Sequence, residues 1–190
     1  MINGMQLCSN LWLVFFAVWI LAAIGTKRAA RRVDWARQIS YAVPVVSGFT
    51  LLLSSRVEIA VLNRRILPRT EALAIIGIVM TAVGMAFAAW ARIHLGRNWS
   101  SAPMVKDQHQ LIRSGPYRLV RHPIYSGLLL AAAGTMLANG KVRGLAGLGL
   151  IWLGFVIKSR IEEEFMIQTF GQQYDEYRRT TGALFPRIGA

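Results

Sequence analysis

The sequence predicts an all-α integral membrane protein with about five transmembrane helices. Of its 190 residues, 54% are hydrophobic and 16% are charged, and the mean hydropathy is +0.40. This apolar content is too high for an ordinary soluble domain of this length. The apolar residues form long runs with basic residues between them, as in multi-pass membrane proteins. Because no repeat or low-complexity linker divides the chain, we expect a single domain over residues 1–190.

Three apolar runs occupy the first half of the chain. The first, residues 5–25, is long enough to cross a hydrocarbon core of about 30 Å, and it lacks the positive flank of a cleaved signal peptide. The second, residues 39–55, is shorter and contains Pro44 and Gly48, which membrane helices tolerate. The third, residues 72–91, carries a stripe of small residues that predicts close approach of another helix. This stripe consists of Ala74, Gly77, Thr81, Gly84, Ala88 and Ala91.

Two shorter apolar runs follow, at residues 123–139 and 144–157. Only four residues separate them, which predicts a tight helical hairpin. We expect the second of these helices to continue past the membrane surface through Lys158 and Arg160. Aromatic residues at 170, 174 and 177 then predict an amphipathic helix that ends before Gly182.

The positions of the 22 basic residues predict the orientation. Sixteen of them lie in segments 26–38, 92–122 and 158–190, and six lie in segments 56–71 and 140–143. The positive-inside rule therefore places the N-terminus outside and the C-terminus in the cytoplasm. A formal charge of +13 also occurs in nucleic-acid-binding proteins, but basic residues interleaved with apolar runs favour membrane insertion, and we expect no nucleic-acid partner.

The polar stretch around which the chain is organised is LIRSGPYRLVRHPIYSG, at residues 111–127. Gly115 and Pro116 mark a turn, and Pro123 suits the first position of a helix. Arg121 and His122 should therefore lie at the mouth of a helix, where unpaired backbone N–H groups and the helix dipole favour an anion. We expect a cytoplasmic pocket here for a small anionic or zwitterionic cofactor.

The sequence lacks the patterns of several common catalytic sites. It has no plausible Ser–His–Asp order, no HExxH motif and no glycine-rich phosphate loop. The three histidines are not at metal-ligand spacing, and the one cysteine, Cys8, excludes an internal disulfide and a cysteine metal cluster. We therefore expect no metal, and a reaction that depends mainly on the alignment of two substrates.

Residues 109–125, HQLIRSGPYRLVRHPIY, resemble the signature of the isoprenylcysteine carboxyl methyltransferase family. Every fixed position of H-x-L-[VI]-x-x-G-x-Y-x-x-x-R-H-P-x-Y is matched. Segments 95–100, 160–164, 170–177 and 181–186 are also similar to that family, so the resemblance covers about residues 92–188. It implies a membrane enzyme that uses S-adenosylmethionine and takes a lipophilic methyl acceptor from the bilayer, such as the carboxylate of a prenylated cysteine.

The resemblance also implies roles for individual residues. Arg160 and Glu164 match the catalytic positions, with Glu164 at the cofactor and Arg160 at the methyl acceptor, near Asn98 and Trp99. A carboxylate suits the amino group of the cofactor, and a guanidinium suits an acceptor carboxylate. Arg160 and Glu164 are one helical turn apart and could also pair with each other. The expected cofactor-binding residues are His109, Gln110, Leu111, Ile112, Tyr117, His122, Pro123, Ile124, Tyr125 and Glu164.

Other functions stay open from the sequence. Relatives of the family methylate phospholipid amines or small thiols. Membrane sterol reductases have a similar C-terminal region but use NADPH, and their greater length argues against them. A non-catalytic scaffold is disfavoured because Arg160, Glu164 and the complete 109–125 pattern are all present.

Overall fold

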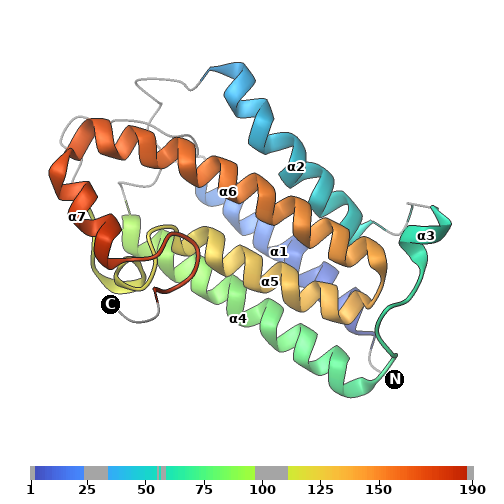
Figure 1. The fold of residues 1–190 in the computed structure, drawn as a ribbon. Helices are drawn as coiled ribbons and strands as arrows, with labels where there is room; N and C mark the ends of the chain where they lie inside the picture. Colours follow the sequence, from blue (N-terminus) through green and yellow to red (C-terminus); the bar gives the residue numbers. More distant parts are fainter. Residues whose placement is uncertain (1–2, 24–33, 55, 57–58, 97–110, 188–190) are drawn as a thin grey trace.

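The protein is a bundle of long helices (Figure 1). The computed structural model describes residues 3–23, 34–54, 56, 59–96 and 111–187. The long helices are α1 (Gly4–Ala23), α2 (Trp35–Leu53), α4 (Glu71–Leu95), α5 (Pro123–Asn139) and α6 (Val142–Phe170). The short ones are α3 (Ala60–Asn63), the 3-10 helix η2 (Gly115–Arg118) and α7 (Gln172–Thr180).

A helix occupies most of each of the five predicted apolar runs, and the all-α class is confirmed. Among the described residues, α1, α4 and α6 are long and apolar enough to cross a membrane. The number of five spans stays a prediction, with α2 and α5 as the additional candidates. Helix α6 continues through Lys158 and Arg160 as expected, and its 29 residues give a length of about 43 Å, which exceeds the hydrocarbon core.

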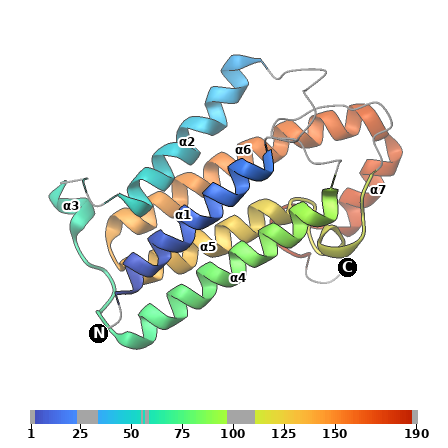
Figure 2. The same ribbon diagram turned by 180° about the vertical axis from the view of Figure 1, so that it is seen from behind.

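Helices α5 and α6 are separated only by Gly140 and Lys141, and Gly140 turns the chain with a φ of 61°. Their most extensive packing is nevertheless with other helices, because α5 lies along α4 and α6 lies along α2. Helix α1 crosses behind α5 and α6 in Figure 1 and in front of them in Figure 2. The bundle is thus built from two tightly packed pairs rather than from the hairpin alone.

The predicted small-residue stripe on α4 is confirmed as the contact surface for α5. A Cβ atom placed on Gly84 would lie 2.4 Å from the backbone nitrogen of Ala131, and one on Gly127 would lie 2.6 Å from the carbonyl oxygen of Gly84. Gly77 and Gly134 face each other in the same way. Such close backbone approach is typical of membrane helix pairs, where small residues replace the hydrophobic effect as the basis of packing.

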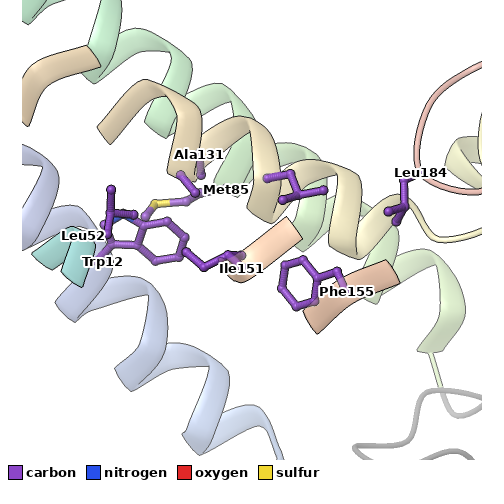
Figure 3. Close-up of a cluster of buried hydrophobic side chains, with 9 residues drawn as sticks. Trp12, Leu52, Met85, Ala131, Ile151, Phe155 and Leu184 are labelled. Atoms are coloured by element: carbon purple, nitrogen blue, oxygen red, sulfur yellow. The ribbon is translucent and has the colours of Figure 1, made fainter. Parts of the chain in front are cut away.

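A core of nine buried apolar residues fills the centre of the bundle (Figure 3). Trp12 of α1 is 1% exposed, and its indole N–H donates to the Thr135 hydroxyl at 2.9 Å. Thr135 lies 3.1 Å from the Thr81 hydroxyl of α4. This buried polar contact fixes α1 against α4 and α5, because an unpaired indole N–H would be costly in an apolar interior.

The two ends of the bundle are built from different elements (Figure 1). Helix α7, η2 and the C-terminal segment gather at one end. The start of α1, helix α3 and the α5–α6 connection gather at the other. The stretch that the sequence marks as functional lies at the first end.

The α4–α5 contact generates a stability prediction. Gly84→Ala should lower the free energy of unfolding by about 1–3 kcal/mol, because the new methyl group meets backbone atoms that cannot move aside. Gly149→Ala is the matched control, since a Cβ there has no neighbour within 4 Å. Thermal unfolding in detergent measures both. A Gly84→Ala protein as stable as Gly149→Ala would contradict this close packing.

Candidate active site

The candidate site closes one end of the bundle where three separate parts of the chain meet. These are the turn around η2, the start of α5 and the C-terminal part of the chain from α6 onward. The backbone N–H groups of Arg121 and His122 donate to the carbonyls of Gly182 and Ala183 at 2.8 and 3.0 Å. The C-terminal segment is thereby held against the polar stretch that precedes α5.

His122 precedes the first residue of α5, as the sequence predicts from Pro123. It lies between two carboxylates of α6, with Nδ1 3.3 Å from Glu162 Oε2 and Nε2 3.3 Å from Glu163 Oε1. Burial alone would lower the pKa of His122, but the hydrogen bonds and negative charges of the two glutamates raise it above its ordinary value. The anion at this helix mouth therefore comes from the protein itself.

Glu163 connects three cationic or polar groups. Its Oε1 accepts from Arg121 Nε at 2.9 Å and from Arg121 Nη2 at 2.6 Å, in addition to the His122 contact. Its Oε2 lies 3.4 Å from Arg178 Nε on α7. The side chains of Arg121 and Glu163 are 10% and 12% exposed, so this pair is a part-buried, charge-assisted contact.

Tyr125 continues the network toward the membrane side. Its hydroxyl donates to Glu162 Oε1 at 2.5 Å. Its ring stacks on His122 with a centroid distance of 5.6 Å and on Phe155 with 4.8 Å. The Lys158 ammonium lies 5.5 Å from the centroid of Tyr125, within the range of a cation–π contact.

Tyr117 is buried within η2, and the Tyr177 hydroxyl of α7 donates to its carbonyl oxygen. Burial raises the pKa of Tyr177 to about 12, so the hydroxyl keeps the proton that this hydrogen bond uses. On the other side, the ring of His94 stacks on Tyr117 at 6.4 Å. Helices α4 and α7 therefore both support the turn that carries the motif.

The structure brings four of the predicted cofactor-binding residues together, namely Tyr117, His122, Pro123 and Tyr125. Each of the first three is largely buried. Leu111, Ile112 and Ile124 are half-buried. The remaining predicted residues of this region, His109, Gln110, Asn98 and Trp99, lie outside the described residues.

The two residues expected to be catalytic occupy the exposed side of α6. Arg160 and Glu164 are both exposed. The pairing that the i,i+4 spacing suggested is not the one found, because the Glu164 carboxylate accepts from Arg37 of α2 at 2.8 Å. The neighbouring helix supplies a guanidinium at closer range, so Glu164 links α6 to α2.

Sequence reasoning missed the importance of Glu162 and Glu163. Of the three consecutive glutamates at positions 162–164, it gave a role only to Glu164. Successive helical residues point about 100° apart, so three consecutive side chains cannot share one environment. The signal that could have identified the buried pair was the need of Arg121 and His122 for carboxylate partners near an apolar helix.

A surface hollow of about 490 Å³ adjoins this network. It is lined by Arg121, Asp175, Arg178, Arg179 and Arg187. Four guanidinium groups could hold an anionic ligand group here. Within the described ranges, His, Cys, Asp and Glu form no group of three or more that could hold a metal ion.

Comparison with known proteins places this site in a family context. The sequence pattern of the phospholipid methyltransferase family matches residues 73–173. A probable protein-S-isoprenylcysteine O-methyltransferase of Oryza sativa subsp. indica is 33% identical over 158 residues, covering 75% of this chain and 82% of the rice protein. Protein-S-isoprenylcysteine O-methyltransferase A of Arabidopsis thaliana is 35% identical over 116 residues, covering 59% of this chain and 58% of the relative.

The fold is also similar to that of a solved membrane protein. The structure of a eukaryotic intramembrane Ras methyltransferase, an isoprenylcysteine carboxyl methyltransferase, superimposes with a TM-score of 0.61 and 24% sequence identity. The match covers 82% of this chain and 55% of the other. The chain thus matches about half of that protein's length.

The carboxylate-bound histidine generates a pH prediction. Because its pKa is raised in the folded state, His122 stabilises the fold below about pH 6.5, its unfolded pKa, and this stabilisation is lost as pH rises through the folded pKa. The unfolding temperature of the wild-type protein should therefore fall between pH 6 and pH 9. His122→Gln should flatten this dependence, and superimposable pH profiles of the two proteins would show that His122 does not titrate with folding.

Proposed function

The chain belongs to the isoprenylcysteine carboxyl methyltransferase family, and from this premise we propose that it transfers a methyl group from S-adenosylmethionine to the carboxylate of a prenylated cysteine. One observation carries the proposal. The motif residues converge on Glu162 and Glu163, whereas Arg160 and Glu164 stay accessible on the exposed side of the same helix. Helix α6 thus has one buried face that builds the site and another that can meet ligands.

The side chains around the candidate site include the chemical groups that S-adenosylmethionine needs. Its amino group needs a carboxylate, its carboxylate needs a cation, and its adenine needs an aromatic or apolar surface. Glu164 supplies the carboxylate for the amino group. The arginines of the hollow beside Arg121 supply the cation for the carboxylate, and the stacked rings of His122 and Tyr125 supply the aromatic surface for the adenine. In this proposal the part-buried Glu162 and Glu163 position His122 and Tyr125 and do not contact the cofactor.

The proposed acceptor site lies along the outer side of α6. Beyond the close contact of Gly154 with Tyr41, the axes of α2 and α6 diverge toward the start of α2 (Figures 1 and 2). Exposed apolar side chains line both helices, among them Val43 of α2 and Trp152 of α6. A prenyl chain could lie along these side chains in the bilayer while its terminal carboxylate reaches Arg160.

The reaction needs alignment more than acid–base catalysis. S-adenosylmethionine supplies a methyl group already activated by a positively charged sulfur. The carboxylate oxygen of the acceptor forms the new bond to carbon, and the electrons of the broken bond stay on sulfur, so no proton moves. Arg160 would bind the carboxylate through its planar fork, and the apolar surroundings would exclude water.

The distribution of basic residues supports the orientation of this site. Sixteen of the 22 lysines and arginines lie on the segments that the positive-inside rule assigns to the cytoplasm, and six lie on the segments that it assigns to the other side. We therefore propose a cytoplasmic site, with the N-terminus of the chain outside. A soluble cofactor is available on that side.

The function can be tested by methyl transfer in reconstituted bilayers. The purified protein, supplied with methyl-labelled S-adenosylmethionine, should label N-acetyl-S-farnesylcysteine but not its methyl ester. Arg160→Lys keeps the charge and loses the paired geometry, so transfer should fall tenfold or more, about 1.4 kcal/mol, while S-adenosylmethionine affinity stays near that of the wild type.

Three results would contradict the proposal. Labelling of phosphatidylethanolamine or a small thiol instead of farnesylcysteine would make the acceptor wrong. Binding of NADPH without binding of S-adenosylmethionine would indicate a reductase. An unchanged transfer rate in Arg160→Lys would remove Arg160 from the acceptor site.

A further inference from the structure

A second cavity lies at the end of the bundle opposite the candidate active site. Its volume is about 420 Å³, and residues at the starts of α1 and α4 and at the α5–α6 connection line it. These elements gather at that end of the bundle in Figure 1. Four basic side chains line it, those of Arg65, Arg69, Lys141 and Arg143. The proposed methyl transfer uses none of these residues.

Backbone pairing fixes the position of two of these cations. Arg65 and Lys141 form an isolated antiparallel bridge between the α3–α4 and α5–α6 connections. The Ile66 N–H donates to the Gly140 carbonyl at 2.9 Å, and the Val142 N–H donates to the Arg64 carbonyl at 3.0 Å. The fold therefore holds like charges side by side, although their repulsion favours separation.

Arg143 supplies an independent sign of a missing ligand. It is only 5% exposed, and one of its terminal nitrogens donates to the Ser54 carbonyl. Its Nε atom is buried and has no hydrogen-bond partner. A buried guanidinium with an unused donor is costly unless an acceptor completes its contacts.

The charges of the cavity are not balanced by the protein. Glu71 is the one carboxylate among its lining residues. None of the ion pairs found between described residues involves Glu71 or the four cations. Burial and the positive charges of Arg143, Arg65 and Arg69 together lower the pKa of Lys141, as expected for cations that lack a counterion.

We propose that this cavity binds the phosphate group of an anionic phospholipid. Guanidinium groups match the oxygens of a phosphate through paired hydrogen bonds, and one such group would give Arg143 Nε its acceptor. A lipid is favoured over a free phosphate because apolar residues also line the cavity, including Leu73 and Leu137. Beyond them Ile75, Ile76 and Val79 of α4 are exposed and could contact the acyl chains.

The experiment measures lipid binding to the purified full-length protein in detergent micelles, without any methyl-transfer assay. Native mass spectrometry and thermal unfolding are followed with dioleoylphosphatidylglycerol, dioleoylphosphatidylcholine or inorganic phosphate. Phosphatidylglycerol should bind at least fivefold more tightly than phosphatidylcholine and raise the unfolding temperature. Arg69→Gln and Lys141→Gln should each remove most of this preference.

Arg64→Gln is the matched control. Arg64 has the same charge and adjoins Arg65, but it is exposed and does not line the cavity, so its substitution should leave the preference intact. The proposal is overturned if Arg64→Gln weakens phosphatidylglycerol binding as much as Arg69→Gln, or if the two lipids bind equally. Stabilisation by inorganic phosphate equal to that by the lipid would make the ligand a soluble anion and overturn the lipid assignment.

Discussion

The contact of Glu163 with Arg121 and His122 is the constraint on which the functional end of the molecule depends. One carboxylate on α6 accepts from the two residues that precede α5 and lies close to Arg178 of α7. Removing one member of such a buried cluster would leave uncompensated charge at the edge of the apolar core. The cluster therefore fixes the position of the start of α5 and holds the C-terminal segment against it. It also fixes the orientation of the His122 and Tyr125 rings.

The features that could be predicted from the sequence follow local rules. The apolar runs predicted the helices, Pro123 predicted the start of α5, and the small residues around Gly84 predicted the close contact of α4 with another helix, which is α5. The partners across the bundle could not be predicted, since they depend on tertiary geometry. Glu164 shows this clearly, because its spacing from Arg160 suggested a pair and yet Arg37, 127 residues earlier in the chain, is its partner. The buried roles of Glu162 and Glu163 arise in the same way.

The two ends of the bundle use positive charge differently. At the candidate active site, Arg121 and His122 are neutralised by carboxylates of the same chain, so the polar network is internally satisfied. At the opposite end, Arg143 keeps a buried unpaired donor and has no carboxylate partner among the described residues. A self-neutralised end suits the alignment of two substrates, whereas the unbalanced end suits the anionic lipid group that we propose for it.

The central claim is that two adjacent glutamates of α6 have different roles: Glu163 stabilises the fold, and Glu164 binds the cofactor. A comparison of Glu163→Gln with Glu164→Gln tests this claim most directly. Thermal unfolding and calorimetric titration with S-adenosylmethionine are measured on both variants. Glu163→Gln should cost about 3 kcal/mol of stability, because it leaves Arg121 and His122, which are 10% and 9% exposed, without the charge of this carboxylate. Glu164→Gln, at a position that is 54% exposed, should unfold like the wild type and bind the cofactor at least tenfold more weakly. Wild-type cofactor affinity in Glu164→Gln, together with wild-type stability in Glu163→Gln, would contradict the account.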